Sequence, residues 1–100
     1  MNANTGETIY EQVLSFDVDN NPVVPTTFDY TLYYNNIVFS GGNVQYSLTD
    51  ISRGMFTFSW SAETYGNYQL YVKNNSTNVI FISDTVNIIP VVDTNIYIGI

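Results

Sequence analysis

The side chains that could do chemistry in this chain are carboxylates and hydroxyls. There is no histidine, so the commonest general base and the commonest metal ligand are missing. Two converging carboxylates could cleave a glycosidic bond, but the nine acidic residues are scattered along the chain. The serine and threonine hydroxyls have only a carboxylate or Lys73 as a candidate base. We therefore expect no catalytic residues and no enzyme activity.

One short acidic segment has the spacing of the first ligands in an EF-hand calcium loop. Asp17, Asp19 and Asn21 stand at alternate positions, as the oxygen ligands of such a loop do. The pattern then requires glycine where Pro22 stands and a bidentate glutamate where Phe28 stands. Both are missing, so we interpret the segment as a solvated turn and expect no metal and no other cofactor.

The charge of the chain argues against two classes of partner. Nine acidic residues stand against only Arg53 and Lys73, which gives a net charge of −7. Such a surface repels phosphate backbones and anionic lipid head groups, so we expect neither nucleic-acid nor membrane binding. No apolar run approaches the ~20 residues that a membrane helix needs.

The N-terminus and the cysteine count indicate a compartment. Residues 1–7 contain no basic region and no apolar core, so we expect no signal peptide. The chain has no cysteine and hence no disulfide. This composition fits either a reducing compartment or a particle assembled inside a cell.

A period of two in the apolar residues predicts strands along most of the chain. Alanine occurs only at positions 3 and 62, whereas Tyr, Phe, Thr, Val, Ile and Asn dominate. The expected strands cover residues 7–18, 26–34, 37–39, 44–48, 55–60, 68–72 and 79–88. Seven short strands with turns at roughly even spacing predict a β-sandwich in which each sheet buries one face.

The alternation also predicts which side chains share a face. In the first strand we expect Leu14, Phe16 and Val18 on one side. The later strands present mostly aromatic faces, which supply most of the core: Phe28, Tyr30, Leu32 and Tyr34, then Val44, Tyr46 and Leu48, then Phe56, Phe58 and Trp60, then Tyr68, Leu70 and Val72. Asn35-Asn36 can adopt positive φ and predicts a tight hairpin.

The sixth expected strand begins with a short motif around a glycine. The segment Thr64-Tyr65-Gly66-Asn67-Tyr68-Gln69-Leu70 resembles the tyrosine corner of immunoglobulin-type domains, which reads Asp-x-Gly-x-Tyr-x-Cys. The resemblance implies that Gly66 permits a backbone bend and that Tyr68 is buried with its hydroxyl on a backbone group. It also implies that Leu70 occupies the core volume of the missing disulfide.

This sequence departs from the antibody pattern at two positions. Thr64 replaces the aspartate, and the core tryptophan expected on the third strand is replaced by Trp60 on the fifth. The resemblance is therefore to the broad immunoglobulin-like superfamily. It implies an all-β fold, a single immunoglobulin-like β-sandwich of seven or eight antiparallel strands over residues 1–90, followed by a strand-like tail over residues 91–100.

A second resemblance concerns the first turn. Val18-Asp19-Asn20-Asn21-Pro22-Val23 is similar to the Asp-x-x-Gly-x-Pro-Val turn of bacterial and phage immunoglobulin-like domains. The Asn- and Tyr-rich, cysteine-free composition also resembles small structural proteins of tailed bacteriophages. The resemblance implies a virion protein made in the host cytoplasm, first of all a capsid decoration (cement) protein, with a tail, baseplate or fibre-associated component as the alternative.

The C-terminal tail is the expected docking segment. Ile96, Ile98 and Ile100 share one side of an alternating run, with Tyr97 on the other. Such a run either adds an eighth strand to its own sandwich or pairs with another chain, as in strand addition. We expect these four residues to bind other virion proteins, capsid or tail subunits, or a second copy, with help from Ile9 and Tyr10.

The tyrosines outside the expected core suggest a third kind of function. Tyr33, Tyr65, Tyr71 and Tyr97 fall on the face opposite the core or in loops. Exposed tyrosines anchor interfaces or stack on sugars, although strands also half-bury tyrosine against cross-strand neighbours. The corresponding alternative is an adhesion module that binds a carbohydrate on a host surface.

Overall fold

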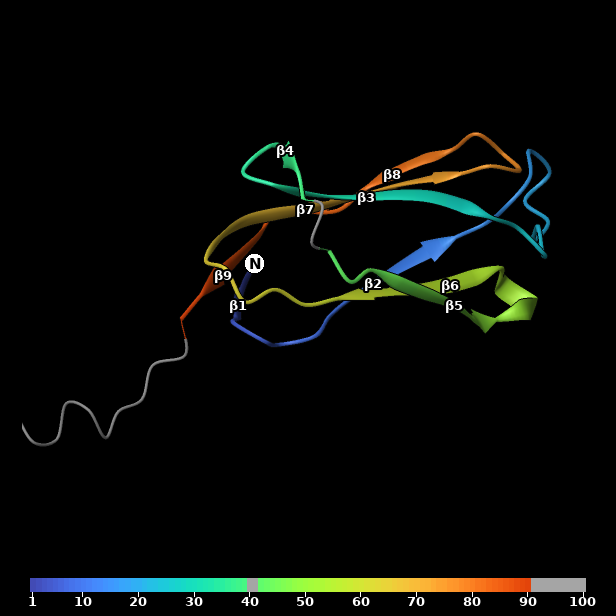
Figure 1. Ribbon diagram of the computed structural model, residues 1–100. Coiled ribbons are helices and arrows are strands. Elements are labelled where there is room, and N and C mark those ends of the chain that lie inside the picture. Colours follow the sequence, from blue (N-terminus) through green and yellow to red (C-terminus); the bar gives the residue numbers. More distant parts are fainter. Residues whose placement is uncertain (40–41, 91–100) are drawn as a thin grey trace, which may run out of the picture.

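The computed structural model describes residues 1–39 and 42–90. The expected docking residues of the tail, Ile96, Tyr97, Ile98 and Ile100, lie outside this part of the chain. The described chain is all-β, with two sheets packed face to face (Figure 1). Its one short helical element is the 3-10 turn η1 (Ile51–Arg53).

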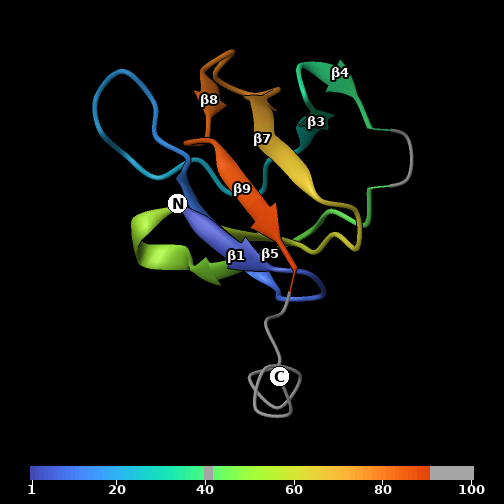
Figure 2. The ribbon, with the colours of Figure 1, turned by 90° about the vertical axis from the view of Figure 1, so that its left-hand side faces the viewer.

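The strands divide unequally between the two sheets. The larger sheet has the order β1 (Asn2–Asn4), β9 (Val86–Ile89), β7 (Gly66–Asn74), β3 (Phe28–Tyr34) and β4 (Ile37–Val38), with β8 (Ile80–Ile82) also paired to β7. The smaller sheet has the order β2 (Ile9–Leu14), β6 (Met55–Trp60) and β5 (Gln45–Asp50). All pairs are antiparallel except β1 and β9, which run side by side in parallel (Figure 2). The predicted all-antiparallel pairing is therefore wrong for this one pair.

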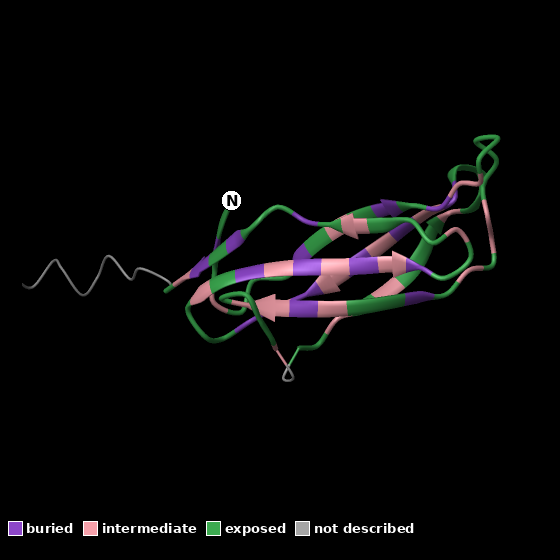
Figure 3. Cartoon of the chain, turned by 90° about the horizontal axis from the view of Figure 1, so that it is seen from above, coloured by how far each residue is buried: buried purple, intermediate pink, exposed green. Residues whose placement is uncertain are grey.

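Alternating burial along β6 and β7 builds the core, as the period of two predicts. Buried and partly buried residues alternate along β6 and, from Tyr68 onward, along β7, and Figure 3 shows such alternation in the strands of the sheet nearest the viewer. From the smaller sheet Phe58 is 0% exposed, and from the larger sheet Tyr68 and Leu70 are 0% exposed. The ring centroids of Phe28 and Phe56 lie 4.8 Å apart in an edge-to-face contact. Each such ring buries about 150–250 Å², so aromatic contacts between the sheets dominate the core.

The prediction for the face of the first strand is wrong. Leu14 and Val18 are 50% and 98% exposed, whereas Ile9 and Val13 are buried. The strand ends at Leu14, and a one-residue change of register exchanges the two faces of a strand. The chain beyond Leu14 forms a loop closed by the Phe16–Pro22 bridge.

The predicted seventh strand, residues 79–88, is two strands separated by a bulge. Between the Tyr71–Ile82 and Tyr68–Val86 pairs, β7 advances three residues and its partner four. The extra residue lies where Ser83 is buried, with its Oγ accepting from Leu70 N at 2.9 Å. A bulge of this kind bends a strand and interrupts its alternation.

The Asn35-Asn36 hairpin forms as predicted. Both residues have positive φ, 48° and 68°, as the tight turns that join antiparallel strands require. Asn35 also joins β3 to β7, because its Oδ1 accepts a hydrogen bond from Asn67 N at 3.0 Å.

Two tyrosines hold the backbone around Gly66. The Tyr68 hydroxyl donates to Thr64 O and the Tyr34 hydroxyl donates to Tyr65 O, each at 2.8 Å. Burial, with a smaller effect of Tyr34, raises the pKa of Tyr68, which keeps its hydroxyl a donor. Gly66 has a φ of 144° and lies directly against the Tyr34 ring, where an added Cβ would collide with ring carbons.

We predict that Gly66→Ala lowers the free energy of unfolding by at least about 2 kcal/mol, because alanine disfavours this φ and overlaps Tyr34. Urea unfolding followed by circular dichroism measures the change. Gly42→Ala is the matched control, since its Cβ would lie 3.4 Å from Leu32 Cδ2 at ordinary contact distance. If the two variants have the same midpoint of urea unfolding, the conformation of Gly66 and its contact with Tyr34 do not stabilise the fold as proposed.

Candidate functional site

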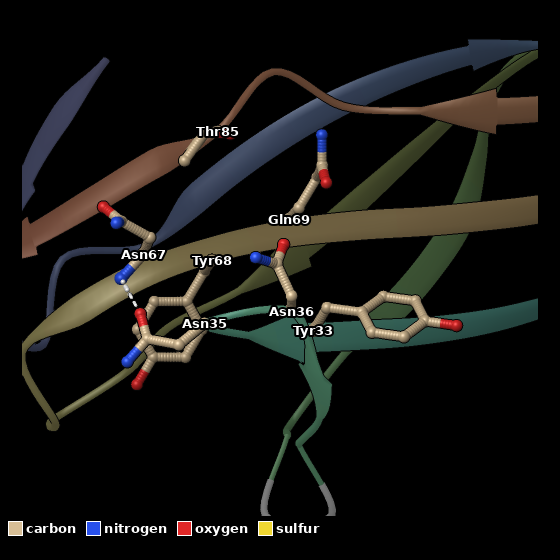
Figure 4. Close-up of a pocket in the computed structure, with 7 residues that line it drawn as sticks. All are labelled: Tyr33, Asn35, Asn36, Asn67, Tyr68, Gln69 and Thr85. Atoms are coloured by element: carbon tan, nitrogen blue, oxygen red, sulfur yellow. Dashed lines mark hydrogen bonds between the residues drawn. The ribbon is translucent and has the colours of Figure 1, made fainter.

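The outer face of the larger sheet carries a shallow hollow of about 250 Å³. It lies where the β3–β4 hairpin meets β7 and the start of β9 (Figure 4). Its lining is polar and aromatic: Tyr33, Asn35, Asn36, Asn67, Tyr68, Gln69 and Thr85. The Tyr68 side chain is 0% exposed, so it supports the hollow from the core side.

Only some of the amide side chains that line this outer-face hollow form hydrogen bonds within the protein. Gln69 Nε2 donates to Ser83 O at 3.0 Å, which fixes that side chain. Within residues 1–39 and 42–90, the side chains of Asn36, Asn67 and Thr85 form no hydrogen bond. The hollow therefore offers donors and acceptors to a ligand.

An adjoining hollow of about 290 Å³ adds an aromatic pair. It shares Tyr33, Asn36 and Gln69 with the first and extends to Tyr71 and Ile82. The rings of Tyr33 and Tyr71 lie 6.5 Å apart in an edge-to-face arrangement. Tyr33 and Tyr71 are half-buried, as the cross-strand alternative predicts, and they lie together beside amides, a combination that suits stacking and hydrogen bonding. Tyr65 is 58% exposed and belongs to neither hollow, and Tyr97 lies outside the described residues.

A second candidate surface lies between two open strand edges. β2 pairs only with β6, and β8 pairs only with β7, among the described strands. Between them runs a groove of about 340 Å³, which we call the edge groove. Its lining is mainly apolar: Gln12, Val13, Leu14, Val72, Asn74, Val79, Ile80 and Phe81.

The edge groove continues into a larger hollow beside the first turn. This hollow of about 430 Å³ shares Val79 with the groove and reaches the apolar Phe16, Val18 and Val23, with the acidic Asp17 among them. Leu14 and Val79 remain 50% and 59% exposed. Contiguous exposed apolar surface of this kind marks interaction sites.

Aromatic rings pack across the β3 and β5 side of the sandwich, where a hollow of about 290 Å³ lies beside Tyr30, Leu32 and Phe39. Tyr30 of the larger sheet and Tyr46 of the smaller one meet with ring centroids 5.8 Å apart. Tyr46 also stacks on Phe58 at 4.9 Å. The two sides therefore differ in chemistry, because the edge groove is lined mainly by aliphatic side chains.

Asn74 fixes one end of the edge groove. This residue is 3% exposed, and its Nδ2 donates to Ser15 Oγ at 2.8 Å. Its Oδ1 accepts from Thr26 Oγ1 and Ser76 N, each at 2.9 Å. One buried amide thus joins both ends of the β2–β3 connection to the β7–β8 turn, which keeps the groove preformed.

The predicted site residues fall into three groups. Ile9 is 1% exposed and pairs with Trp60, so its expected role in docking is wrong, because its side chain belongs to the core. Tyr10 is 67% exposed and accessible. Tyr68, Leu70 and Trp60, which we expect to have a structural role, are 0%, 0% and 2% exposed and therefore belong to the core.

The first turn uses its carboxylate for the backbone. Asp17 Oδ1 accepts from Asp19 N and Asn21 N, each at 2.9 Å. In the part of the chain that the structure describes, no three His, Cys, Asp or Glu residues are grouped to hold a metal ion. Nor does that part contain a helix long and apolar enough to cross a membrane.

Comparison of the chain with protein-family models, with curated proteins and with solved structures gave no significant match.

The sequence reading missed the edge groove and the role of Tyr34. The alternation predicts Leu14 in the core, and an inward Leu14 gives no sign of the open edge of β2. The one available signal was Val79-Ile80 directly after a polar turn, where two apolar residues begin a short edge strand. Tyr34 carried no local motif, since it contacts Gly66 only through the fold.

One carboxylate of β2 lies outside the lining of the edge groove. Glu11 is half-buried on β2, and burial, with a smaller effect of Asp84, raises the pKa of its carboxyl. The raised pKa means that the folded state favours the protonated form, so the contribution of Glu11 to stability falls as the pH rises above the usual range of a glutamate.

We predict that Glu11→Gln stabilises the protein at pH 7 by a few tenths of a kcal/mol, up to about 0.5 after solvent screening. Near pH 3 the glutamate is protonated in both states, so the two proteins should then have equal stability. Urea unfolding at the two pH values measures the difference. Glu7→Gln, at an exposed residue, controls for the change in net charge, and a loss of stability in Glu11→Gln at pH 7 would contradict the prediction.

Proposed function

We propose that the two sheets form an immunoglobulin-like sandwich. The order β9-β7-β3 in one sheet and β2-β6-β5 in the other corresponds to strands G, F, C and B, E, D of immunoglobulin domains. β4 then corresponds to the additional strand next to C. The buried Tyr68, with its hydroxyl on Thr64 O, supports the same assignment as a tyrosine corner.

We further propose that the protein is a non-enzymatic structural component of a virus particle, a capsid decoration or cement protein of a tailed bacteriophage. The observation that carries a docking function is the edge groove, where two open strand edges border an apolar surface. The composition and the first turn support the phage assignment by resemblance alone, because a fold does not fix a function.

Docking in this proposal combines backbone and apolar contacts. An added strand gains hydrogen bonds from the open edge of a sheet, and alternate side chains fill pockets beside it. A stable interface buries about 800 Å² on each partner, to which the tail and the edge groove can each contribute. A tail, baseplate or fibre-associated component would use the same contacts at another place in the particle.

Deletion of residues 93–100 is predicted to abolish incorporation into particles while leaving a folded domain. The deleted residues follow β9, so the described sandwich keeps its strands. Quantitative mass spectrometry of purified particles measures incorporation, and circular dichroism measures folding. Ile37→Ala, a change at an exposed residue of β4 outside both candidate surfaces, is the matched control. Full incorporation of the truncated chain would exclude docking through the tail.

A second candidate function is carbohydrate binding on the outer face of the larger sheet. The edge-to-face pair Tyr33 and Tyr71 beside the amides of Asn36 and Gln69 favours it. A tyrosine ring offers an apolar face to a sugar, while amide groups bond its hydroxyls. This surface is separate from the edge groove, since the two share no lining residue.

The carbohydrate hypothesis predicts binding on a glycan array that falls at least about tenfold in Tyr33→Ala and Tyr71→Ala, about 1.4 kcal/mol each. Tyr33→Phe keeps the ring and should retain most of the binding. Tyr10→Ala on the smaller sheet is the control. Absence of any bound glycan, or equal binding by all four variants, would eliminate this function.

A further inference from the structure

We infer that the edge groove accepts residues 94–100 of a second copy of this chain as an added strand. This inference deepens the proposed docking function by naming a partner for the tail. It depends on three observations: the form of the acceptor, the sequence of the donor, and the place where β9 ends.

The acceptor is an open sheet edge beside an uncharged groove, and Glu11 lies half-buried further along the same strand. In an antiparallel ladder every second residue turns its N–H and C=O away from its partner. β2 pairs with β6 along Ile9–Leu14, and no described strand pairs with its other side. The lining of the groove beside this edge contains apolar and amide side chains but no charged one. An incoming strand therefore finds free backbone groups next to an apolar surface.

The donor matches this acceptor in pattern and in charge. Residues 94–100 read Thr-Asn-Ile-Tyr-Ile-Gly-Ile and contain no charged side chain. In an extended strand Ile96, Ile98 and Ile100 lie on one face, which suits an apolar groove. β-branched residues at alternate positions also favour the extended conformation.

The net charge favours contact between these two segments over other self-contacts. Two copies, each with a charge of −7, repel one another over most of their surface. Approach costs least where both surfaces are uncharged. The edge groove and residues 94–100 are such a pair.

The end of β9 favours a groove on another copy. Ile88 pairs with Gly66, at the first residue of β7, whereas the groove lies beside Val72 and Asn74 near its other end. Six to eight residues of strand separate these positions, about 20–27 Å. After Ile89 the chain would have to reverse and pass β1, and residues 90–95 extended span only about 20 Å. Within one copy, the tail could therefore place only its final residues in the edge groove. In the edge groove of a second copy it can place Ile96, Ile98 and Ile100.

Each copy carries one donor and one acceptor, so two assemblies are possible. Reciprocal exchange of tails closes a twofold dimer, and one-way donation builds an open chain of copies. The contact between tail and edge groove is the same in the dimer and in the open chain. Mixing a variant that lacks the tail with a variant that lacks the groove tests this contact directly.

The experiment uses sedimentation velocity on the full chain from about 1 to about 100 μM. We expect concentration-dependent self-association that is lost in the chain truncated by residues 93–100. Leu14→Glu and Val79→Glu place a charge on half-exposed groove positions and should weaken association at least about tenfold. Ile37→Glu, at a 71% exposed residue of β4 on another edge, should associate like the unmodified chain. Higher salt should tighten association, because it screens the repulsion between copies.

A mixture of two non-associating variants gives the decisive result. The truncated chain has only an acceptor, and Val79→Glu has only a donor, so together they should form a one-to-one complex. Circular dichroism and urea unfolding establish that each variant is folded.

Four results would overturn the inference. The unmodified chain could remain monomeric throughout, the truncated chain could still associate, or the two variants could fail to form a complex. A monomeric full chain combined with binding of a residues 93–100 peptide to the truncated chain would instead place the tail in its own groove. None of these results bears on incorporation into particles, which is measured separately, so failure of the inference and failure of the proposed function remain distinguishable.

Discussion

Burial of one face of β7 is the constraint on which the rest of the structure depends. This strand pairs with β3 on one side and with both β8 and β9 on the other. Its inward residues Tyr68, Leu70 and Val72 are 0%, 0% and 1% exposed. A one-residue change of register would turn these side chains to water, and at about 25 cal/mol per Å² of apolar surface the cost would be several kcal/mol. The position of every other element of the larger sheet follows from this strand.

The sequence was sufficient to predict the elements whose alternation is uninterrupted. β3, β6 and β7 each combine a clear period of two with large side chains, and the Asn35-Asn36 hairpin has local turn chemistry. Prediction failed where tertiary contacts determine the face, the end or the partner of a strand. The face of β2 depends on where the strand ends, the break between β8 and β9 depends on buried Ser83, and β1 pairs in parallel with a strand more than 80 residues away. No local pattern encodes such contacts.

The candidate sites were predictable to different degrees. Tyr33 and Tyr71 could be placed on the outer face from alternation alone, because an outward position in a strand is a local property. Their proximity to Asn36 and Gln69 required the pairing of β3 with β7. The edge groove was not predictable, since a strand edge is open only if none of the other described strands pairs with it. That depends on the whole topology and not on a local pattern. The two surfaces also differ in chemistry, because one offers ring faces and amides and the other offers unpaired backbone and aliphatic surface.

The single tryptophan gives the molecule an internal optical reporter. Trp60 is 2% exposed, and its ring centroid lies 5.3 Å from that of Tyr68. An indole in such apolar surroundings emits at short wavelength, and the nine tyrosines can transfer excitation to it. Because the indole is remote from water, its emission follows separation of the sheets and stays insensitive to events at the outer surface. The wavelength of maximal Trp60 emission therefore distinguishes unfolding of the sandwich from dissociation of a binding partner.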